Sequence, residues 1–125
     1  MDKKSKVIVV EDDELLLKVY KHKLESEGID TIISTDGEDA VSKVFSEKPD
    51  LIVLDLMLPK KDGFWVILKI RENQEFANTP IIVISNRFEP VDKERAFALG
   101  ANGFLVKVNI TIEEVVEKVK EYLKK

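Results

Sequence analysis

The sequence contains no cysteine, 5 glycines, 4 prolines and a single tryptophan among its 125 residues. The lack of cysteine excludes disulfide bonds, a thiol nucleophile and thiolate metal ligands. Few glycines and prolines, with 44% hydrophobic and 35% charged residues, are typical of a folded domain rather than of a disordered segment. The length predicts one domain, residues 1–125.

Long apolar runs are also missing. The charged N-terminal residues lead into the short run Val7–Val10, which is far too short for a signal peptide or a membrane span. A formal net charge of -4 and a pI of about 5.1 argue against nucleic-acid binding through electrostatics alone. We therefore expect a cytoplasmic protein with neither a membrane nor a nucleic acid as direct partner.

Five short apolar runs rich in valine and isoleucine are present. Four of them show no polar alternation, which is typical of strands covered on both faces, and their β-branched residues favour strands over helices. The predicted strands are Val7–Val10, Thr31–Ile33, Leu51–Leu54, Ile81–Ile84 and Phe104–Val106.

A helical period follows the first strand. Its apolar face is predicted to comprise Leu16, Val19, Tyr20 and Leu24, before Gly28 ends the pattern. The leucines at positions 15, 16 and 17 are consecutive, so they cannot all face the sheet. We expect at least one of them to be exposed, either as an ordinary surface leucine or as part of a docking face.

The remaining helices alternate with the strands. They are expected at Gly37–Glu47, Asp62–Asn73 and Val91–Leu99, with Pro90 in the first turn of the third, and at residues 112–123 after a Thr111–Glu114 capping box. Strand and helix alternate five times, which predicts an α/β fold. The expected architecture is a doubly wound five-stranded parallel sheet of order 2-1-3-4-5 with five flanking helices.

Polar residues follow the strands at one rim of this sheet. Glu11 and Asp12 come after the first strand, Asp55 after the third, Ser85 after the fourth and Lys107 after the fifth. Carboxylate oxygens select Mg²⁺ or Mn²⁺, and a carboxylate beside such a metal can attack an activated phosphoryl group. An ammonium and a hydroxyl can then bind phosphoryl oxygens. The rim therefore predicts phosphoryl transfer.

Four segments of the chain resemble the receiver domain of bacterial two-component response regulators, the CheY-like superfamily. They are VIVVEDDELL, LIVLDLMLPKKDG, IIVISN and GANGFLVK, and the resemblance covers essentially the whole chain. It implies that Asp55 is the phosphoacceptor, that Asp12 binds Mg²⁺ directly and that Glu11 holds the metal through water. It also implies that Met57 supplies a backbone carbonyl to the metal.

The resemblance assigns the remaining site residues as well. Ser85 fills the family's Ser/Thr switch position, Lys107 its lysine, and Phe104 its aromatic switch position. Two positions depart from the family pattern. Val108 stands where proline usually follows the lysine in a cis peptide, and Asn86 stands where a small residue is common. These departures concern the aim of the lysine and access to the phosphoryl site.

The predicted function is a phosphorylation-dependent switch of a two-component phosphorelay. Asp55 is expected to take a phosphoryl group, with Mg²⁺, from a histidine kinase, a phosphotransfer protein or a small acyl phosphate. The chain would catalyse only its own phosphorylation and slow dephosphorylation, so it is not expected to be an enzyme. It would act as a stand-alone receiver on an unidentified downstream protein, and the resemblance allows a dimer through the fourth helix, fifth strand and fifth helix.

Other functions fit the sequence less well. A phosphatase of the haloacid dehalogenase type needs an aspartate two residues after the nucleophile, where Met57 stands. A flavin or nucleotide binder on such a sheet needs a glycine-rich or hydroxyl-rich loop after the first strand, which is acidic here. A receiver that binds partners without phosphorylation is the third alternative. Asp12 or Asp13 alone could also be a simple helix cap.

Overall fold

The computed structural model describes residues 4–87 and 89–124, and its five strands form one parallel sheet. The order β2-β1-β3-β4-β5 confirms the predicted topology. Every neighbouring pair runs parallel. The strands are β1 Lys6–Val10, β2 Asp30–Ser34, β3 Leu51–Leu54, β4 Ile81–Ser85 and β5 Gly103–Val106.

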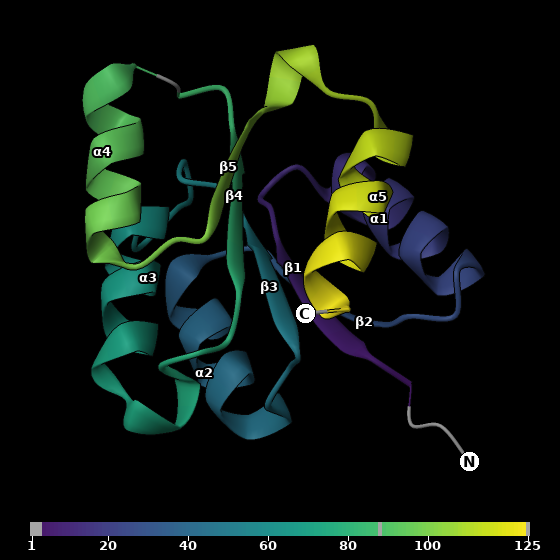
Figure 1. Cartoon of the computed structure of the whole chain (residues 1–125), viewed down its shortest axis with the longest axis horizontal. Helices are drawn as coiled ribbons and strands as arrows, with labels where there is room; N and C mark the ends of the chain where they lie inside the picture. The colour runs from purple at the N-terminus through teal and green to yellow at the C-terminus, as the bar shows by residue number, and fades with distance from the viewer. Residues whose placement is uncertain (1–3, 88, 125) are drawn as a thin grey trace.

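Helices connect the strands and cover both faces of the sheet. In Figure 1, α1 and α5 lie on one face, and α2, α3 and α4 lie on the other. Their bounds are α1 Glu14–Ser26, α2 Gly37–Glu47, α3 Gly63–Glu72, α4 Pro90–Leu99 and α5 Ile112–Leu123, with short 3-10 turns η1 Gln74–Phe76 and η2 Lys107–Asn109. None of the helices in the described ranges is long and apolar enough to cross a membrane.

The core has two halves separated by the sheet. Alternate side chains of β1, such as Ile8 and Val10, pack under α2, α3 and α4. Their neighbours Val7 and Val9 pack under α1 and α5. All of these side chains are buried. Burial on both faces explains why the central strands show no polar alternation.

The buried face of α1 differs from the predicted one. Leu17, Tyr20 and Leu24 are buried, whereas Val19 is 42% exposed. The prediction that Val19 faces the sheet is therefore wrong, because the helix presents the i, i+3, i+7 stripe that starts at Leu17. The expectation for the three leucines is confirmed, since Leu15 is 75% exposed.

Candidate functional site

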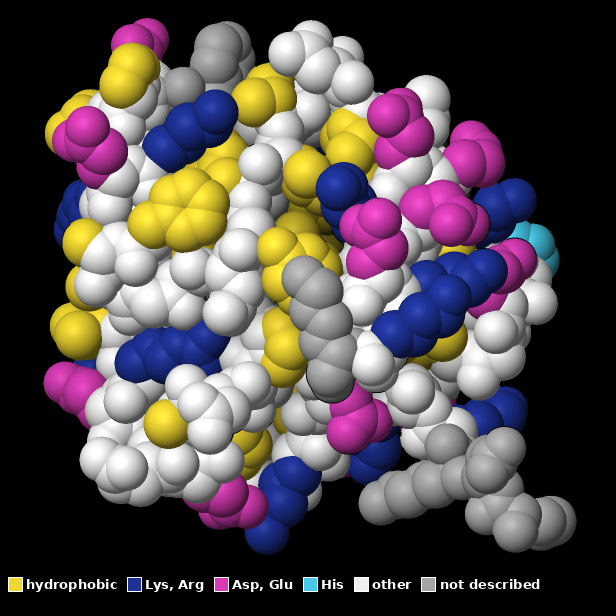
Figure 2. Space-filling model, in the orientation of Figure 1, with side chains coloured by type: hydrophobic (Ala, Val, Ile, Leu, Met, Phe, Trp, Pro, Cys, Tyr) yellow, Lys and Arg dark blue, Asp and Glu magenta, His cyan; other side chains and the backbone are white. Residues whose placement is uncertain are grey.

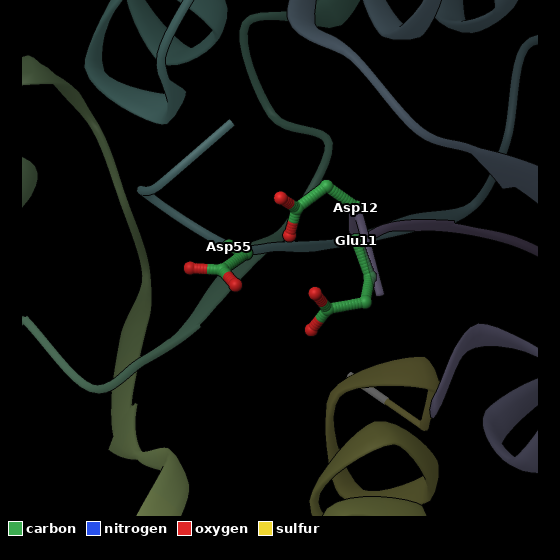
Figure 3. Close-up of side chains that lie close together, drawn as sticks. All are labelled: Glu11, Asp12 and Asp55. Atoms are coloured by element: carbon green, nitrogen blue, oxygen red, sulfur yellow. The ribbon is translucent and has the colours of Figure 1, made fainter. Parts of the chain in front are cut away.

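Three carboxylates converge at the carboxyl ends of β1 and β3. Because Val10 pairs with Leu54 across these strands, Glu11 and Asp55 emerge side by side. Glu11, Asp12 and Asp55 each offer an oxygen within 4.8 Å of the others, as Figure 3 illustrates. Glu11 and Asp55 are buried, but Asp12 is exposed. The cluster therefore has a buried floor and one side open to water.

Lys107 joins this cluster from the turn that follows β5. Its Nζ lies 2.6 Å from Glu11 Oε1 and 2.7 Å from Asp55 Oδ2. Burial disfavours its charge, but hydrogen bonds and the charges of the two carboxylates outweigh this and raise the pKa of Lys107. Burial raises the pKa of Glu11, and its hydrogen bond with Lys107 opposes the increase. Three carboxylates facing one ammonium leave a formal charge of −2, which matches one divalent cation.

The residue that caps α1 is not one of the three carboxylates of the acidic cluster. Asp13 is the N-cap, because its Oδ1 accepts hydrogen bonds from the N–H groups of Leu15 at 3.1 Å and Leu16 at 3.2 Å. The Asp13 N–H in turn donates to Glu11 Oε2 at 3.0 Å. The interpretation of Asp12 as the helix cap is wrong. Its carboxylate instead belongs to the cluster with Glu11 and Asp55.

Backbone groups of the loop after β3 lie close to Asp55 and hold it in position. The Met57 N–H donates to Asp55 Oδ1 at 3.1 Å, and the Gly63 N–H donates to the Leu56 carbonyl at 2.8 Å. A Cβ at position 63 would lie 2.6 Å from the Asp55 carbonyl oxygen, so only glycine fits this close return. The side chain of Met57 is exposed, and its backbone carbonyl as a metal ligand stays a prediction.

Ser85 and Phe104 lie on the two strands beyond β3. Ser85 is fully buried at the end of β4, and its Oγ accepts a hydrogen bond from the Arg87 N–H at 3.0 Å. Phe104 on β5 is half-buried against the core under α2, α3 and α4, and Lys93 Nζ lies 5.8 Å from the centre of its ring. Their roles as switch residues stay predictions.

The two departures from the family pattern have simple structural outcomes. The Lys107–Val108 peptide bond is trans, as is every other bond between described residues. Val108 and Asn86 are both exposed. An ion pair beside Ser85 was not predicted from the sequence. In it, Arg87 Nε lies 2.9 Å from Asp92 Oδ1. No motif marked these two residues, and only their five-residue spacing across a helix start could have suggested a contact.

Comparison with known proteins identifies the family. Residues 7–120 match the family model described as the response regulator receiver domain. The chain belongs to this family, whose members are the signalling switches of two-component systems rather than enzymes in the usual sense. Receiver domains bind a divalent metal through acidic residues, and the cluster of Glu11, Asp12 and Asp55 supplies such residues here.

Individual relatives agree with this assignment. The chain is 39% identical over 120 residues to the alkaline phosphatase synthesis transcriptional regulatory protein PhoP of Bacillus subtilis, covering 96% of the chain and 49% of that protein. It therefore spans about half the length of this curated relative. The receiver domain of the Francisella response regulator 1452 superposes with a TM-score of 0.87 at 32% identity, covering 96% of this chain and 97% of that one. The chemotaxis response regulator CheY4 of Vibrio cholerae superposes with a TM-score of 0.89 at 26% identity, covering 96% and 99%.

Proposed function

We propose that this receiver domain is a switch that accepts a phosphoryl group on Asp55. One Asp55 carboxylate oxygen attacks the phosphorus of a phosphohistidine on a histidine kinase or phosphotransfer protein. The new O–P bond forms as the P–N bond breaks, and the imidazole leaves with the bonding electron pair. The observation that supports this most is the buried position of Asp55 with an ammonium 2.7 Å from its Oδ2. Lys107 is then placed to stabilise charge on a transferred phosphoryl oxygen.

Mg²⁺ is the proposed cofactor, with Mn²⁺ as a substitute. The donor set fits, because it consists of carboxylate oxygens, carries a formal charge of −2 with Lys107 included, and opens to water at Asp12. Asp12 and Asp55 would bind the metal directly, Glu11 through water, and Met57 through its backbone carbonyl. When bound, the metal would offset the negative charge that accumulates as phosphate and carboxylate approach each other.

The proposed output is a change in partner binding. Phosphorylation adds charge at Asp55, and Ser85 and Lys107 would donate hydrogen bonds to the phosphoryl oxygens. Phe104 would follow toward the core and alter the surface formed by α4, β5 and α5. Figure 2 shows several acidic side chains over α5 with basic ones among them, and Glu113, Glu114, Glu117 and Glu121 line a groove there together with Lys118. This face favours a protein partner, or a second copy of the chain, over direct nucleic-acid contact.

The exposed side of α1 belongs to the same proposal. Leu15 and Val19 expose 75% and 42% of their surface there, close to the acidic site in the chain. We infer that this side contributes to kinase docking. The cytoplasmic location expected from the sequence remains part of the proposal, as does the absence of activity on a separate substrate.

Intact-mass measurement after incubation with acetyl phosphate and Mg²⁺ tests the proposed function. The native chain should gain one phosphoryl group, whereas Asp55→Asn and a sample without divalent metal should gain none. If the native chain stays unmodified with both acetyl phosphate and a phosphorylated histidine kinase, the unphosphorylated binding module becomes the better interpretation. Asp39→Asn is a matched control, because Asp39 pairs with Lys43 at 3.0 Å outside the acidic site.

A further inference from the structure

Asp92 is a buried carboxylate that the proposed phosphotransfer does not use. Within residues 4–87 and 89–124, the buried acidic side chains are Glu11, Asp55 and Asp92, and the first two belong to the acidic site. The Asp92 side chain is only 6% exposed, while its partner Arg87 is 48% exposed. Burying a carboxylate costs free energy unless it is paired and hydrogen-bonded, so the surroundings of Asp92 need an explanation.

Both oxygens of Asp92 are engaged with the connection between β4 and α4. Oδ1 accepts a hydrogen bond from Arg87 Nε at 2.9 Å, and Oδ2 accepts one from the Glu89 N–H at 3.2 Å. Asp92 lies in the first turn of α4, where the helix dipole also favours a negative charge. One buried side chain therefore ties two points of the connection to the start of α4.

Arg87 connects Asp92 to Ser85 through two hydrogen bonds. Its backbone N–H donates to Ser85 Oγ at 3.0 Å, while its side chain is held by Asp92. A serine hydroxyl has one proton to donate and two lone pairs to accept with. The Arg87 N–H occupies one lone pair and fixes the side-chain direction, which leaves the hydroxyl proton free to donate to a phosphoryl oxygen.

Packing places the same arginine against the start of α3. The Arg87 guanidinium lies 5.5 Å from the centre of the Phe64 ring, and Arg95 lies 4.1 Å from the same ring. Phe64 is buried and follows Gly63, whose N–H donates to the Leu56 carbonyl next to Asp55. The Arg87 side chain is thus held between α4 and the start of α3, so its backbone N–H has little freedom to move.

We propose that Arg87 and Asp92 are positioning residues for phosphotransfer, which hold the Ser85 hydroxyl in the direction from which it donates to the phosphoryl group. This inference rests on the proposed function, because it assigns how Ser85 is oriented within that same site. Neither residue touches the phosphoryl group, and both act through the Arg87 N–H. Loosening the ion pair should therefore slow phosphoryl transfer without weakening the encounter with the phosphodonor.

The first experiment measures hydrogen exchange of the Arg87 amide by NMR in the unphosphorylated chain. Ser85→Ala, Arg87→Met and Asp92→Asn should each accelerate this exchange. Arg95→Met is the matched control, because Arg95 packs on the same Phe64 ring and makes no hydrogen bond to Asp92 among the described residues. If Asp92→Asn leaves the Arg87 amide as protected as in the native chain, the proposal is overturned, whether or not the chain is phosphorylated.

The second experiment measures phosphorylation rates over a range of acetyl phosphate concentrations with Mg²⁺. Arg87→Met should lower the maximal rate about tenfold, the order expected when a hydrogen bond to a charged group is weakened, and leave the half-saturating concentration unchanged. In a Ser85→Ala background, Arg87→Met should have no further effect. An equal fall in that background would show that Arg87 does not act through Ser85. A native chain that forms no adduct would instead contradict the proposed function, and the amide-exchange result would still decide the role of Asp92.

Discussion

Replacing Lys107 by methionine should destabilise the metal-free protein strongly. Lys107 bonds Glu11 at 2.6 Å and Asp55 at 2.7 Å, and these carboxylate side chains are only 3% and 7% exposed. Removing one partner of a buried ion pair typically costs about 3–5 kcal/mol, because the remaining charge stays buried without compensation. The Lys107 side chain is itself 21% exposed at the rim, so we expect a loss of about 3 kcal/mol, at the lower end of this range.

Urea unfolding followed by fluorescence of the single tryptophan, Trp65, measures this loss. With a denaturant dependence of about 1.5 kcal/mol per molar urea, the midpoint should fall by about 2 M. Free Mg²⁺ at about 100 times its dissociation constant should return about 2.7 kcal/mol to Lys107→Met. Lys43→Met is the control. Lys43 lies 3.0 Å from Asp39 in a pair whose side chains are 39% and 41% exposed, so it should cost under about 1 kcal/mol.

The destabilisation caused by Lys107→Met should depend on pH. Burial raises the pKa of Glu11 above its ordinary value of 4.5, so the folded state binds its proton more tightly than the unfolded state. The cost of burying Glu11 as a carboxylate therefore appears as pH rises through this elevated pKa. Without Lys107 the elevation should grow, so Lys107→Met should destabilise more at pH 8 than at pH 5. Equal midpoints for Lys107→Met and Lys43→Met, or no recovery with Mg²⁺, would refute the reasoning.

Three further predictions concern other parts of the fold. Gly63→Ala should lower the free energy of unfolding by roughly 1–3 kcal/mol in urea titrations, because the added Cβ would meet the Asp55 carbonyl oxygen at 2.6 Å. Arg71→Met should lower the thermal midpoint. Arg71 donates two hydrogen bonds to the Gly100 carbonyl and one to the Phe76 carbonyl, and the Phe76 carbonyl keeps a further bond from the Thr79 N–H. Loss of the Arg71 bonds should cost about 2 kcal/mol. Burial raises the pKa of Asp39, but the hydrogen bonds from the Ser34 hydroxyl and Lys43 outweigh this effect and lower the pKa below 3.8. The ionised Asp39 therefore stabilises the fold above pH 3.8, and this stabilisation is lost as pH falls through the pKa of the folded state. Asp39→Asn should therefore narrow the difference in urea midpoint between pH 7 and pH 3.

The strands were predictable because burial leaves a direct mark on composition. Val7–Val10 and Leu51–Leu54 are covered on both faces, so both faces had to be apolar. The parallel order then followed from the alternation with helices, and the order placed Glu11 beside Asp55. The candidate site was therefore predictable as a group of residues at one rim of the sheet.

Details that depend on tertiary packing could not be predicted from the sequence. The first helix has two overlapping apolar stripes, one through Leu16 and Val19 and one through Leu17 and Tyr20, and only packing against the sheet selects the second. Likewise, Arg87 and Asp92 are ordinary charged residues near a helix start. Their pairing depends on how the chain turns between β4 and α4, which no local pattern specifies.

Locating the phosphoryl group tests the central claim most directly. An acyl phosphate formed with Mg²⁺ and acetyl phosphate can be reduced with borohydride, which converts the phosphorylated aspartate to homoserine, and peptide sequencing by mass spectrometry then identifies the altered position. The account predicts homoserine at Asp55 alone, and only in samples that contain Mg²⁺. Homoserine at Asp12 or at any other position, or modification that does not depend on a divalent metal, would contradict it.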